Sequence, residues 1–263
     1  MKTELQHSTT LSPEQYSPPF GNVPLSAAFL VDCLVGMSNY PDGYFEWAIC
    51  DIPYGIGVGR MAYLSEVNTS VKQKNGTRLN PNKTKSKYTL KDWDKEPPTQ
   101  MYFDELKRIS KNQIIFGIEY VNWTGVGTGR IKWDKCFSEG VSFKRHEVAY
   151  CSSIDYTYEL PLLWAGMCQA KSLSEPTTQQ GNKKLNEKRI HPCHKPLLLY
   201  QALLKQFVKV GDKIVDTHLG GGSIRIAAKQ YGCPFVGFEI DEEYFYKQEK
   251  RFRNYSSQLR CAF

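Results

Sequence analysis

The chain has 263 residues, of which 41% are hydrophobic, and this length suits one large α/β domain or two smaller ones. That hydrophobic content excludes a chain that is disordered throughout. The formal net charge of +7 is typical of proteins with an anionic partner such as nucleic acid.

No apolar stretch reaches membrane-spanning length, and the polar residues 1–24 lack the apolar core of a signal peptide. Several of the 8 cysteines, such as Cys50 and Cys151, lie in apolar runs, which is typical of a reducing compartment. We expect a flexible segment over 1–24, a single domain over 25–263, and a cytoplasmic protein. His191-Pro-Cys193-His194 has no second ligand pair at zinc spacing, so we expect no metal site.

An ordered region begins with residues 27–36, and the apolar run FEWAIC then ends at Asp51. A run without alternation is typical of a strand that is covered on both faces, as in parallel sheets. Residues 60–95 carry nine Lys or Arg against three acids, which predicts a long basic loop.

Helical and extended patterns alternate after this loop. We expect helices from Thr99, over Pro196–Val208 and over Ser223–Tyr231, and strands over 112–116, in RIKWDK and EVAYCSS between 130 and 152, over Lys213–Asp216 and over Phe235–Glu239. Residues 155–189 are expected to be irregular. The β-α-β order predicts an α/β fold with a mostly parallel sheet and helices on both faces.

Three glycines, Gly220 to Gly222, come directly after the strand that ends at Asp216. Glycines at this point allow a tight turn and let a ligand approach the backbone closely. Glu239 ends the next strand 18 residues after Gly221, and an acid at this place can accept hydrogen bonds from both hydroxyls of a ribose. The spacing is not G-x-G-x-x-G, which disfavours NAD.

The turn Asp51-Ile52-Pro53-Tyr54 suits a planar amino-heterocycle. The amine of adenine is a poor nucleophile because its lone pair is shared with the ring, and two acceptors on its hydrogens would turn that lone pair outward. The Asp51 carboxylate and the Ile52 carbonyl can be these acceptors. Pro53 biases Ile52 toward an extended conformation, and Tyr54 offers a face on which a flipped base can stack.

Together, the D-P-P-Y-like turn and the D-x-x-x-G-x-G loop resemble the S-adenosylmethionine-dependent amino-group DNA methyltransferases. The catalytic motif comes first and the cofactor loop late, which resembles the permuted β-type order of phage and prophage adenine-N6 enzymes. Three further stretches agree with the family: WDKEPP with YFDELKRISKNQIIFG (93–117), WDK (133–135), and HPCHKP (191–196), which is similar to H-P-T-Q-K-P. The resemblance spans roughly residues 25–250.

This resemblance implies a Rossmann-like fold, S-adenosyl-L-methionine as cofactor, double-stranded DNA as substrate and base flipping in a bacterial or phage-infected cell. The implied catalytic residues are Asp51, Ile52, Pro53 and Tyr54. The implied cofactor-binding residues are Cys50, Asp51, Lys195, Pro196, Asp216, His218, Leu219, Gly220, Gly221, Gly222, Ser223, Glu239 and Ile240. The basic residues expected to contact DNA are Arg60, Lys72, Lys74, Arg78, Lys83, Lys85, Lys87, Lys183, Lys184, Lys188 and Arg189.

Some positions depart from the family pattern, since Ile52 replaces a proline, Gly221 a common Ser and His218 a common Phe. Cytosine-N4 methylation, RNA adenine methylation and a catalytically silent DNA-binding relative therefore stay open. Asp51 favours adenine, because the cytosine enzymes typically carry Ser at that place. We expect residues 155–189 to recognise the target sequence, with Gln169, Gln179, Gln180 and Asn182 reading bases. A homodimer and a cognate restriction enzyme are both compatible with the family.

Overall fold

A computed structural model describes residues 26–60, 88–137, 144–166, 168–179, 181–182, 184 and 186–260. The segment 1–24 lies outside these residues, and so does Gln180. The same holds for seven of the basic residues expected to contact DNA, which are Lys72, Lys74, Arg78, Lys83, Lys85, Lys87 and Lys183.

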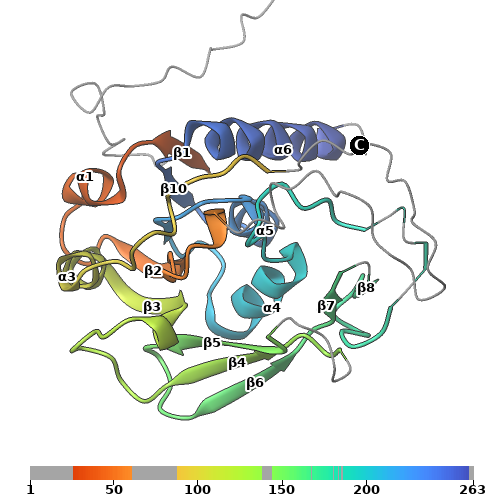
Figure 1. The fold of residues 1–263 in the computed structure, drawn as a ribbon, viewed down its shortest axis with the longest axis horizontal. Coiled ribbons are helices and arrows are strands. Elements are labelled where there is room, and N and C mark those ends of the chain that lie inside the picture. The colour runs from red at the N-terminus through yellow and green to blue at the C-terminus, as the bar shows by residue number, and fades with distance from the viewer. Residues whose placement is uncertain are drawn as a thin grey trace, which may run out of the picture.

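An eight-stranded sheet with the order β1-β10-β9-β2-β3-β5-β4-β6 lies at the centre of the fold (Figure 1). Its strands are β1 (Ala27–Leu30), β2 (Phe45–Asp51), β3 (Ser110–Phe116), β4 (Arg130–Asp134), β5 (His146–Cys151), β6 (Thr157–Pro161), β9 (Ile214–Asp216) and β10 (Phe235–Glu239). Only β5 pairs antiparallel with its neighbours, and the other pairs are parallel. The mostly parallel α/β sheet predicted from the sequence is therefore confirmed.

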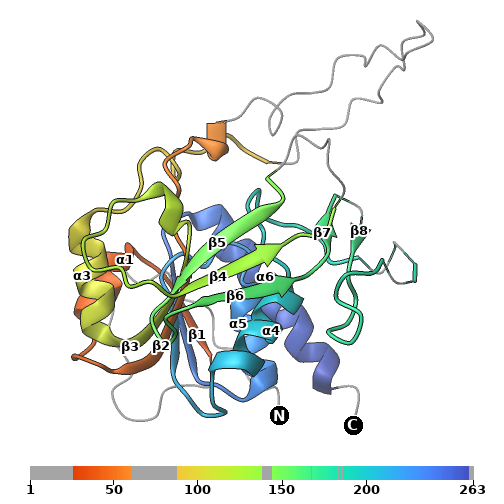
Figure 2. The ribbon, with the colours of Figure 1, turned by 90° about the horizontal axis from the view of Figure 1, so that it is seen from below.

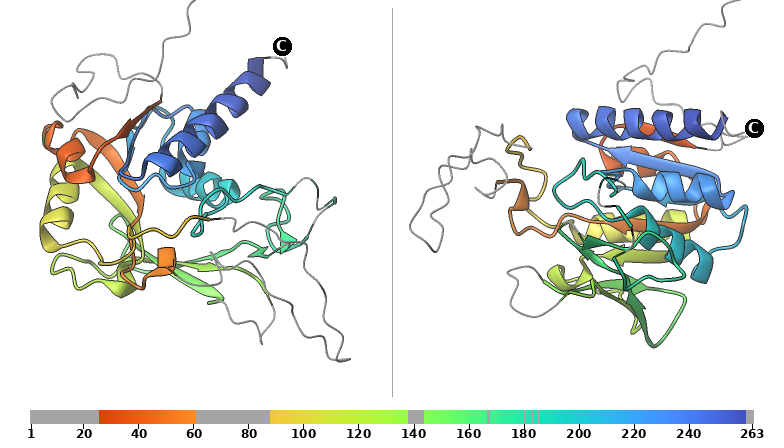
Figure 3. Two further views of the ribbon diagram at one scale, coloured as in Figure 1. Left: turned by 45° about the horizontal axis from the view of Figure 1, so that its top comes forward. Right: turned by 90° about the vertical axis from the view of Figure 1, so that its right-hand side faces the viewer.

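Helices cover both faces of this sheet (Figure 3). They are α1 (Cys33–Ser38), α3 (Gln100–Ile109), α4 (Leu197–Phe207), α5 (Ser223–Tyr231) and α6 (Glu242–Arg260), with short 3₁₀ turns η2 (Val58–Arg60) and η3 (Ile118–Tyr120). Strand β2 is buried on both sides: Trp47 and Ile49 pack in the core beneath α4 and α5, whereas Ala48 and Cys50 pack beneath α1 and α3. None of the described helices is long and apolar enough to span a membrane.

The predicted elements α4, β9, α5 and β10 agree with the structure within one residue at each end, whereas the sequence analysis made no prediction for α6. The expectation that residues 155–189 are irregular is wrong, because they contain β6 and the small hairpin of β7 (Trp164–Ala165) and β8 (Cys168–Gln169). Strand β6 lies at the edge of the sheet, where Leu160 is its one buried residue, so its sequence carries little hydrophobic pattern. Figure 2 shows β5, β4 and β6 splayed from the other strands by the twist of the sheet.

Strands β2 and β9 are parallel neighbours, with Trp47 opposite Ile214 and Ala48 opposite Val215. From β9 the chain passes through α5 to β10 on one side, and from β2 it passes through α3 to β3 on the other side. The sheet therefore has a topological switch point between β9 and β2. In open α/β sheets, ligands bind at the carboxyl ends of the strands at such a point.

Candidate active site

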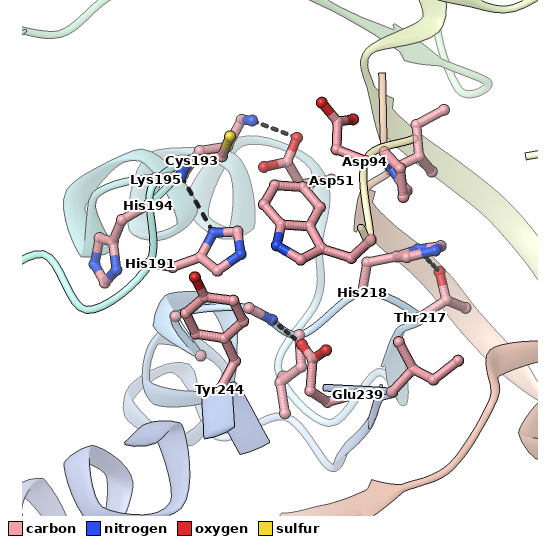
Figure 4. A pocket seen from close by; sticks show the side chains of 18 of the residues that line it. Asp51, Asp94, His191, Cys193, His194, Lys195, Thr217, His218, Glu239 and Tyr244 are labelled. Atoms are coloured by element: carbon pink, nitrogen blue, oxygen red, sulfur yellow. Dashed lines mark hydrogen bonds and ion pairs between the residues drawn. The ribbon is translucent and has the colours of Figure 1, made fainter. Parts of the chain in front are cut away.

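A cavity of about 260 Å³ lies at the carboxyl ends of β2, β9 and β10. The residues around it that the sequence analysis singled out are Asp51, Ile52, Pro53, Tyr54, Lys195, His218, Leu219, Gly220, Gly221, Gly222, Ser223, Glu239 and Ile240. Two motifs that are far apart in the sequence thus line one cavity. Figure 4 shows Asp51 with Lys195 on one side of it and Glu239 with Tyr244 on the other.

The Glu239 side of the cavity has the features of a nucleoside site. The Glu239 carboxylate accepts hydrogen bonds from the backbone N–H of Gly220 at 2.8 Å and of Asp241 at 2.9 Å. Burial raises the pKa of Glu239 to about 7, although these two hydrogen bonds oppose the shift. Gly220 adopts a positive φ of 48°, which favours glycine. Ile240 lines the cavity and is 62% exposed, so it offers an apolar surface to a flat ring.

Three of the residues expected to bind the cofactor, Cys50, Asp216 and Pro196, do not line the cavity. Asp216 is 2% exposed, and its carboxylate accepts the backbone N–H of His218 at 3.0 Å. It therefore shapes the glycine loop from behind. Cys50 is buried in the core beneath α1 and α3, and Pro196 is the N-cap of α4. Direct contact of these three with a cofactor stays a prediction.

The turn that follows Asp51, for which the sequence predicts a catalytic role, is held by Asp94, a residue to which the sequence analysis assigned no role. One carboxylate oxygen of Asp94 accepts the backbone N–H of Tyr54 at 2.6 Å and of Gly55 at 3.0 Å. The other oxygen accepts the N–H of Val58 at 2.8 Å. Asp94 is 2% exposed, so water competes little for these bonds. The side chain of Ile52, which stands where the resembled motif has a proline, packs in the core.

Residues 91–94, which we call the strap, connect the two sides of the cavity. Lys91 forms ion pairs with Asp241 at 2.9 Å and with Glu243 at 3.2 Å, close to Glu239. Trp93 lines the cavity with its ring centroid 4.8 Å from that of His191. Asp94 binds the catalytic turn at the other side. In the sequence, the strap overlaps the stretch WDKEPP. That stretch resembles the family pattern, but it did not indicate the contacts that the strap makes.

Asp51 is the last residue of β2, and its carboxylate forms an ion pair with Lys195. The Tyr54 hydroxyl donates to Asp51 at 3.0 Å and accepts from Lys195 Nζ at 3.1 Å. Burial raises the pKa of Asp51, and the charge of Lys195 opposes that shift. The Tyr54 ring stacks on Tyr120 with centroids 4.7 Å apart and an interplanar angle of 10°. One ring face of Tyr54 is therefore already covered.

His191 and Cys193 also line the cavity and are held in neutral forms. Burial lowers the pKa of His191 to about 3, and its Nδ1 accepts the backbone N–H of Cys193 at 3.2 Å. Burial likewise raises the pKa of the Cys193 thiol, which disfavours a thiolate nucleophile. Among the described residues, no group of three or more His, Cys, Asp or Glu side chains is arranged to hold a metal ion.

Gly221 and His194 fit each other closely. A Cβ atom at position 221 would lie 2.2 Å from Nδ1 of His194, a distance much shorter than real Cβ atoms show to any neighbouring atom. His194 is fixed by Glu187, whose carboxylate lies 2.9 Å from Nε2 and also pairs with Arg251 at 2.6 Å. In the motifs that the chain resembles, Gln stands at the place of His194 and Ser is common at that of Gly221. The two departures from the family pattern therefore lie in contact with each other.

Four of the basic residues expected to contact DNA can be placed. Arg60 is exposed and pairs with Asp92, and Lys184 and Lys188 are exposed. Arg189 is half-buried, with its guanidinium 4.5 Å from the ring centroid of Trp164. Lys188 and Arg189 line a second groove of about 530 Å³ whose other lining residues are Tyr88, Ile190, Leu197, Ile226, Lys247, Lys250, Arg251, Asn254 and Tyr255. No carboxylate is among the described residues that line this groove.

Residues 63–250 match the family model N6_N4_Mtase, a family of DNA methylases. A candidate methylase of Escherichia coli (strain K12), YubD, is 22% identical over 223 residues, which cover 84% of this chain and 87% of that protein. The type II methyltransferase M2.DpnII of Streptococcus pneumoniae is 34% identical over 61 residues, 23% of each chain. The crystal structure of the M1.HpyAVI–SAM complex has a TM-score of 0.48 at 16% identity and covers 86% of this chain and 98% of its own.

The contact between Gly221 and His194 predicts a compensated pair of substitutions. Gly221→Ser alone should lower the melting temperature and cofactor affinity, because its Cβ collides with the His194 ring. Gly221→Ser combined with His194→Gln should recover most of both losses, giving an interaction energy of about 0.5–3 kcal/mol in a double-mutant cycle. Thermal unfolding and calorimetry on the four proteins measure this. Additive losses would contradict the coupling.

Proposed function

Because residues 63–250 match its model, the chain belongs to the N6/N4 family of DNA methylases, and we propose that it methylates adenine N6 within a short DNA sequence. The methyl donor of this family is S-adenosylmethionine. The observation that carries the proposal is the position of Asp51, whose carboxylate lines the same cavity as Glu239 and the glycine loop. A hydrogen-bond acceptor for an amine then lies beside the proposed nucleoside site.

The cavity suits the cofactor in both chemistry and shape. The buried Glu239 carboxylate is placed to accept the ribose hydroxyls, and Ile240 to contact the adenine ring. Gly220 to Gly222 bring the backbone to the edge of the cavity, ahead of the N-terminus of α5. The N-terminus of a helix favours negative charge, so this place suits the carboxylate of S-adenosylmethionine. Bound there, S-adenosylmethionine supplies an electrophilic methyl group on a positively charged sulfur.

Asp51 and Ile52 act on the target amine. With the Asp51 carboxylate and the Ile52 carbonyl accepting its two hydrogens, the nitrogen keeps its lone pair for the methyl group. The N–C bond forms as the C–S bond breaks, and the sulfur keeps the bonding electrons. The nitrogen gains positive charge in this step, which the Asp51 carboxylate stabilises, and it then loses one of its two protons to solvent. Asp94 keeps both acceptors in place through its three bonds to the turn.

Cytosine-N4 methylation is the second candidate, since the family includes both activities and the same turn can serve either amine. Asp51 supports adenine, because the cytosine enzymes that the sequence resembles typically carry Ser there. The exposed residues Lys184 and Lys188 support binding of the DNA backbone, and so does the cationic groove beside α6. The similarity to type II methyltransferases supports a role beside a restriction enzyme that reads the same sequence.

Asp51→Ala should reduce methyl transfer by about 100-fold or more, because it removes the acceptor that stabilises charge on the amine. The affinity for S-adenosylhomocysteine should change little, since Glu239 and the glycine loop are intact. Nucleoside mass spectrometry on DNA from expressing cells measures the product, and calorimetry measures binding. Wild-type turnover by Asp51→Ala would refute the mechanism, and N4-methylcytosine as the product would establish the second candidate.

Cofactor affinity should fall as the pH decreases through about 7. The pKa of Glu239 is raised to about 7 in the folded protein from 4.5, so the carboxylate is ionised at pH 8 and largely protonated at pH 6. A protonated acid accepts ribose hydrogen bonds poorly, and the affinity for S-adenosylhomocysteine should drop by up to about 10-fold per unit below that pH. Calorimetry from pH 6 to 8 tests this.

Two variants separate the groups that titrate in this range. The Glu239→Gln variant should bind S-adenosylhomocysteine weakly, and its affinity should depend little on pH. Burial raises the pKa of Asp216 to about 8, so Asp216→Asn is needed to remove its contribution. If Asp216→Asn keeps the full pH dependence and Glu239→Gln loses it, Glu239 is the responsible group. A wild-type affinity that is constant between pH 6 and 8 would contradict the prediction.

Replacing residues 171–189 by the matching segment of a related enzyme with a different target should change the methylated sequence. This segment precedes α4 and carries polar and basic side chains outside the central sheet. Sequencing of modified DNA from expressing cells reads the result directly. An unchanged target would assign recognition to another part of the chain, with residues 60–95 as the better candidate.

A further inference from the structure

The catalytic carboxylate shares its lysine with a second buried carboxylate. Lys195 is paired with Asp51, and its Nζ also lies 3.1 Å from Oε2 of Glu147. The side chain of Lys195 is 5% exposed. The Tyr54 hydroxyl lies between the two acids, with 3.0 Å to Asp51 and 3.4 Å to Glu147. Lys195 thus has two carboxylates within reach, only one of which belongs to the catalytic turn.

Glu147 comes from β5, the one strand of the central sheet that runs opposite to the others. It is paired on its far side with Lys135, which follows β4, at 2.5 Å. Burial alone would raise the pKa of Glu147, but Lys195 and Lys135 together outweigh burial and hold the pKa at about 2. Glu147 therefore stays ionised at any pH at which the enzyme would work.

Two demands meet at the Asp51 carboxylate. It has to accept a hydrogen from the target amine, yet its Oδ1 atom is bound by both Lys195 and the Tyr54 hydroxyl, so a carboxylate that turns toward the amine loosens its pair with Lys195. Releasing Lys195 without another partner would leave an unpaired charge in a buried place, which is strongly unfavourable. The ammonium does not need to travel to water, because Glu147 already lies within ion-pair distance.

We propose that Glu147 is a positioning residue that takes over Lys195 when the target amine reaches Asp51. This inference rests on the proposed methyl transfer to an amine. Lys135 keeps Glu147 in place, and Glu147 keeps Lys195 charged while the Asp51 oxygens turn to the base. Four charges, two of each sign, then stay paired both before and after the base enters.

The experiment compares Glu147→Gln with wild type, using a duplex in which 2-aminopurine stands next to the target adenine, which keeps its 6-amino group. In Glu147→Gln, Lys195 has only Asp51 as a carboxylate partner, so it should hold Asp51 more tightly. The fluorescence increase on base entry should weaken, and kcat/KM for DNA should fall about 10-fold or more. The affinity for S-adenosylhomocysteine should stay close to wild type.

The pH profile distinguishes this role from a merely structural one. The ionised and neutral groups that interact with Asp51 are Lys195, Glu147, Tyr54, Cys193, Tyr200 and Asp216. Of these, the charge of Glu147 raises the pKa of Asp51 and that of Lys195 lowers it. Removing the Glu147 charge should therefore shift the acid limb of kcat/KM to lower pH, even as the rate falls.

Two further variants complete the test. Glu147→Asp keeps the charge and should recover most of the activity and the wild-type acid limb, also if Glu147→Gln folds poorly. Glu159→Gln removes a carboxylate from β6, at the edge of the same sheet, whose pair with Lys132 is exposed, and it should behave as wild type. A Glu147→Gln protein with wild-type base entry and pH profile would overturn the inference alone. A wild-type protein that modifies no amine in DNA would overturn the proposed function, and the inference with it.

Discussion

The parallel pairing of β2 with β9 is the constraint on which the site depends. These strands are far apart in the sequence, yet their pairing places the turn after Asp51 beside the glycine loop after Asp216. Because both strands are buried on two faces, a shift of register would move apolar side chains between the two cores as well as displace the loops. The geometry of the reaction is thereby tied to the packing of the sheet.

The sequence predicted the elements whose local signals agree with their environment. Strand β10 and helix α5 are examples, since each is strongly patterned and is bounded by Gly or a charged residue. Strand β6 was not predicted, because it lies at the edge of the sheet and only one of its side chains is buried. The sequence predicted the catalytic and cofactor motifs because glycines, a proline and acids directly after buried strands are uncommon unless a tight turn or a binding site requires them.

Residues that act through long-range contacts gave no such signal. Asp94 looks like one more acid in a charged loop, and only the fold brings it to the N–H groups of Tyr54, Gly55 and Val58. Glu147 is one of several polar residues in a strand, and its importance depends on Lys195, which arrives from a different part of the chain. Cys50 and Asp216 lie next to the two motifs in sequence but are buried behind the cavity, so their contact with a cofactor stays a prediction.

The anchoring of the strap has a consequence for how such an enzyme can diversify. Lys91 donates its backbone N–H to the carbonyl of Gly59 at 3.0 Å, and Arg60 pairs with Asp92, so residues 59–60 and 91–92 are joined directly to each other. Lengthening a closed loop is inexpensive, since doubling it adds only about 0.6 kcal/mol of closure entropy. Changes in the length of the chain between these contacts should therefore cost little stability, and the turn after Asp51 should keep its shape.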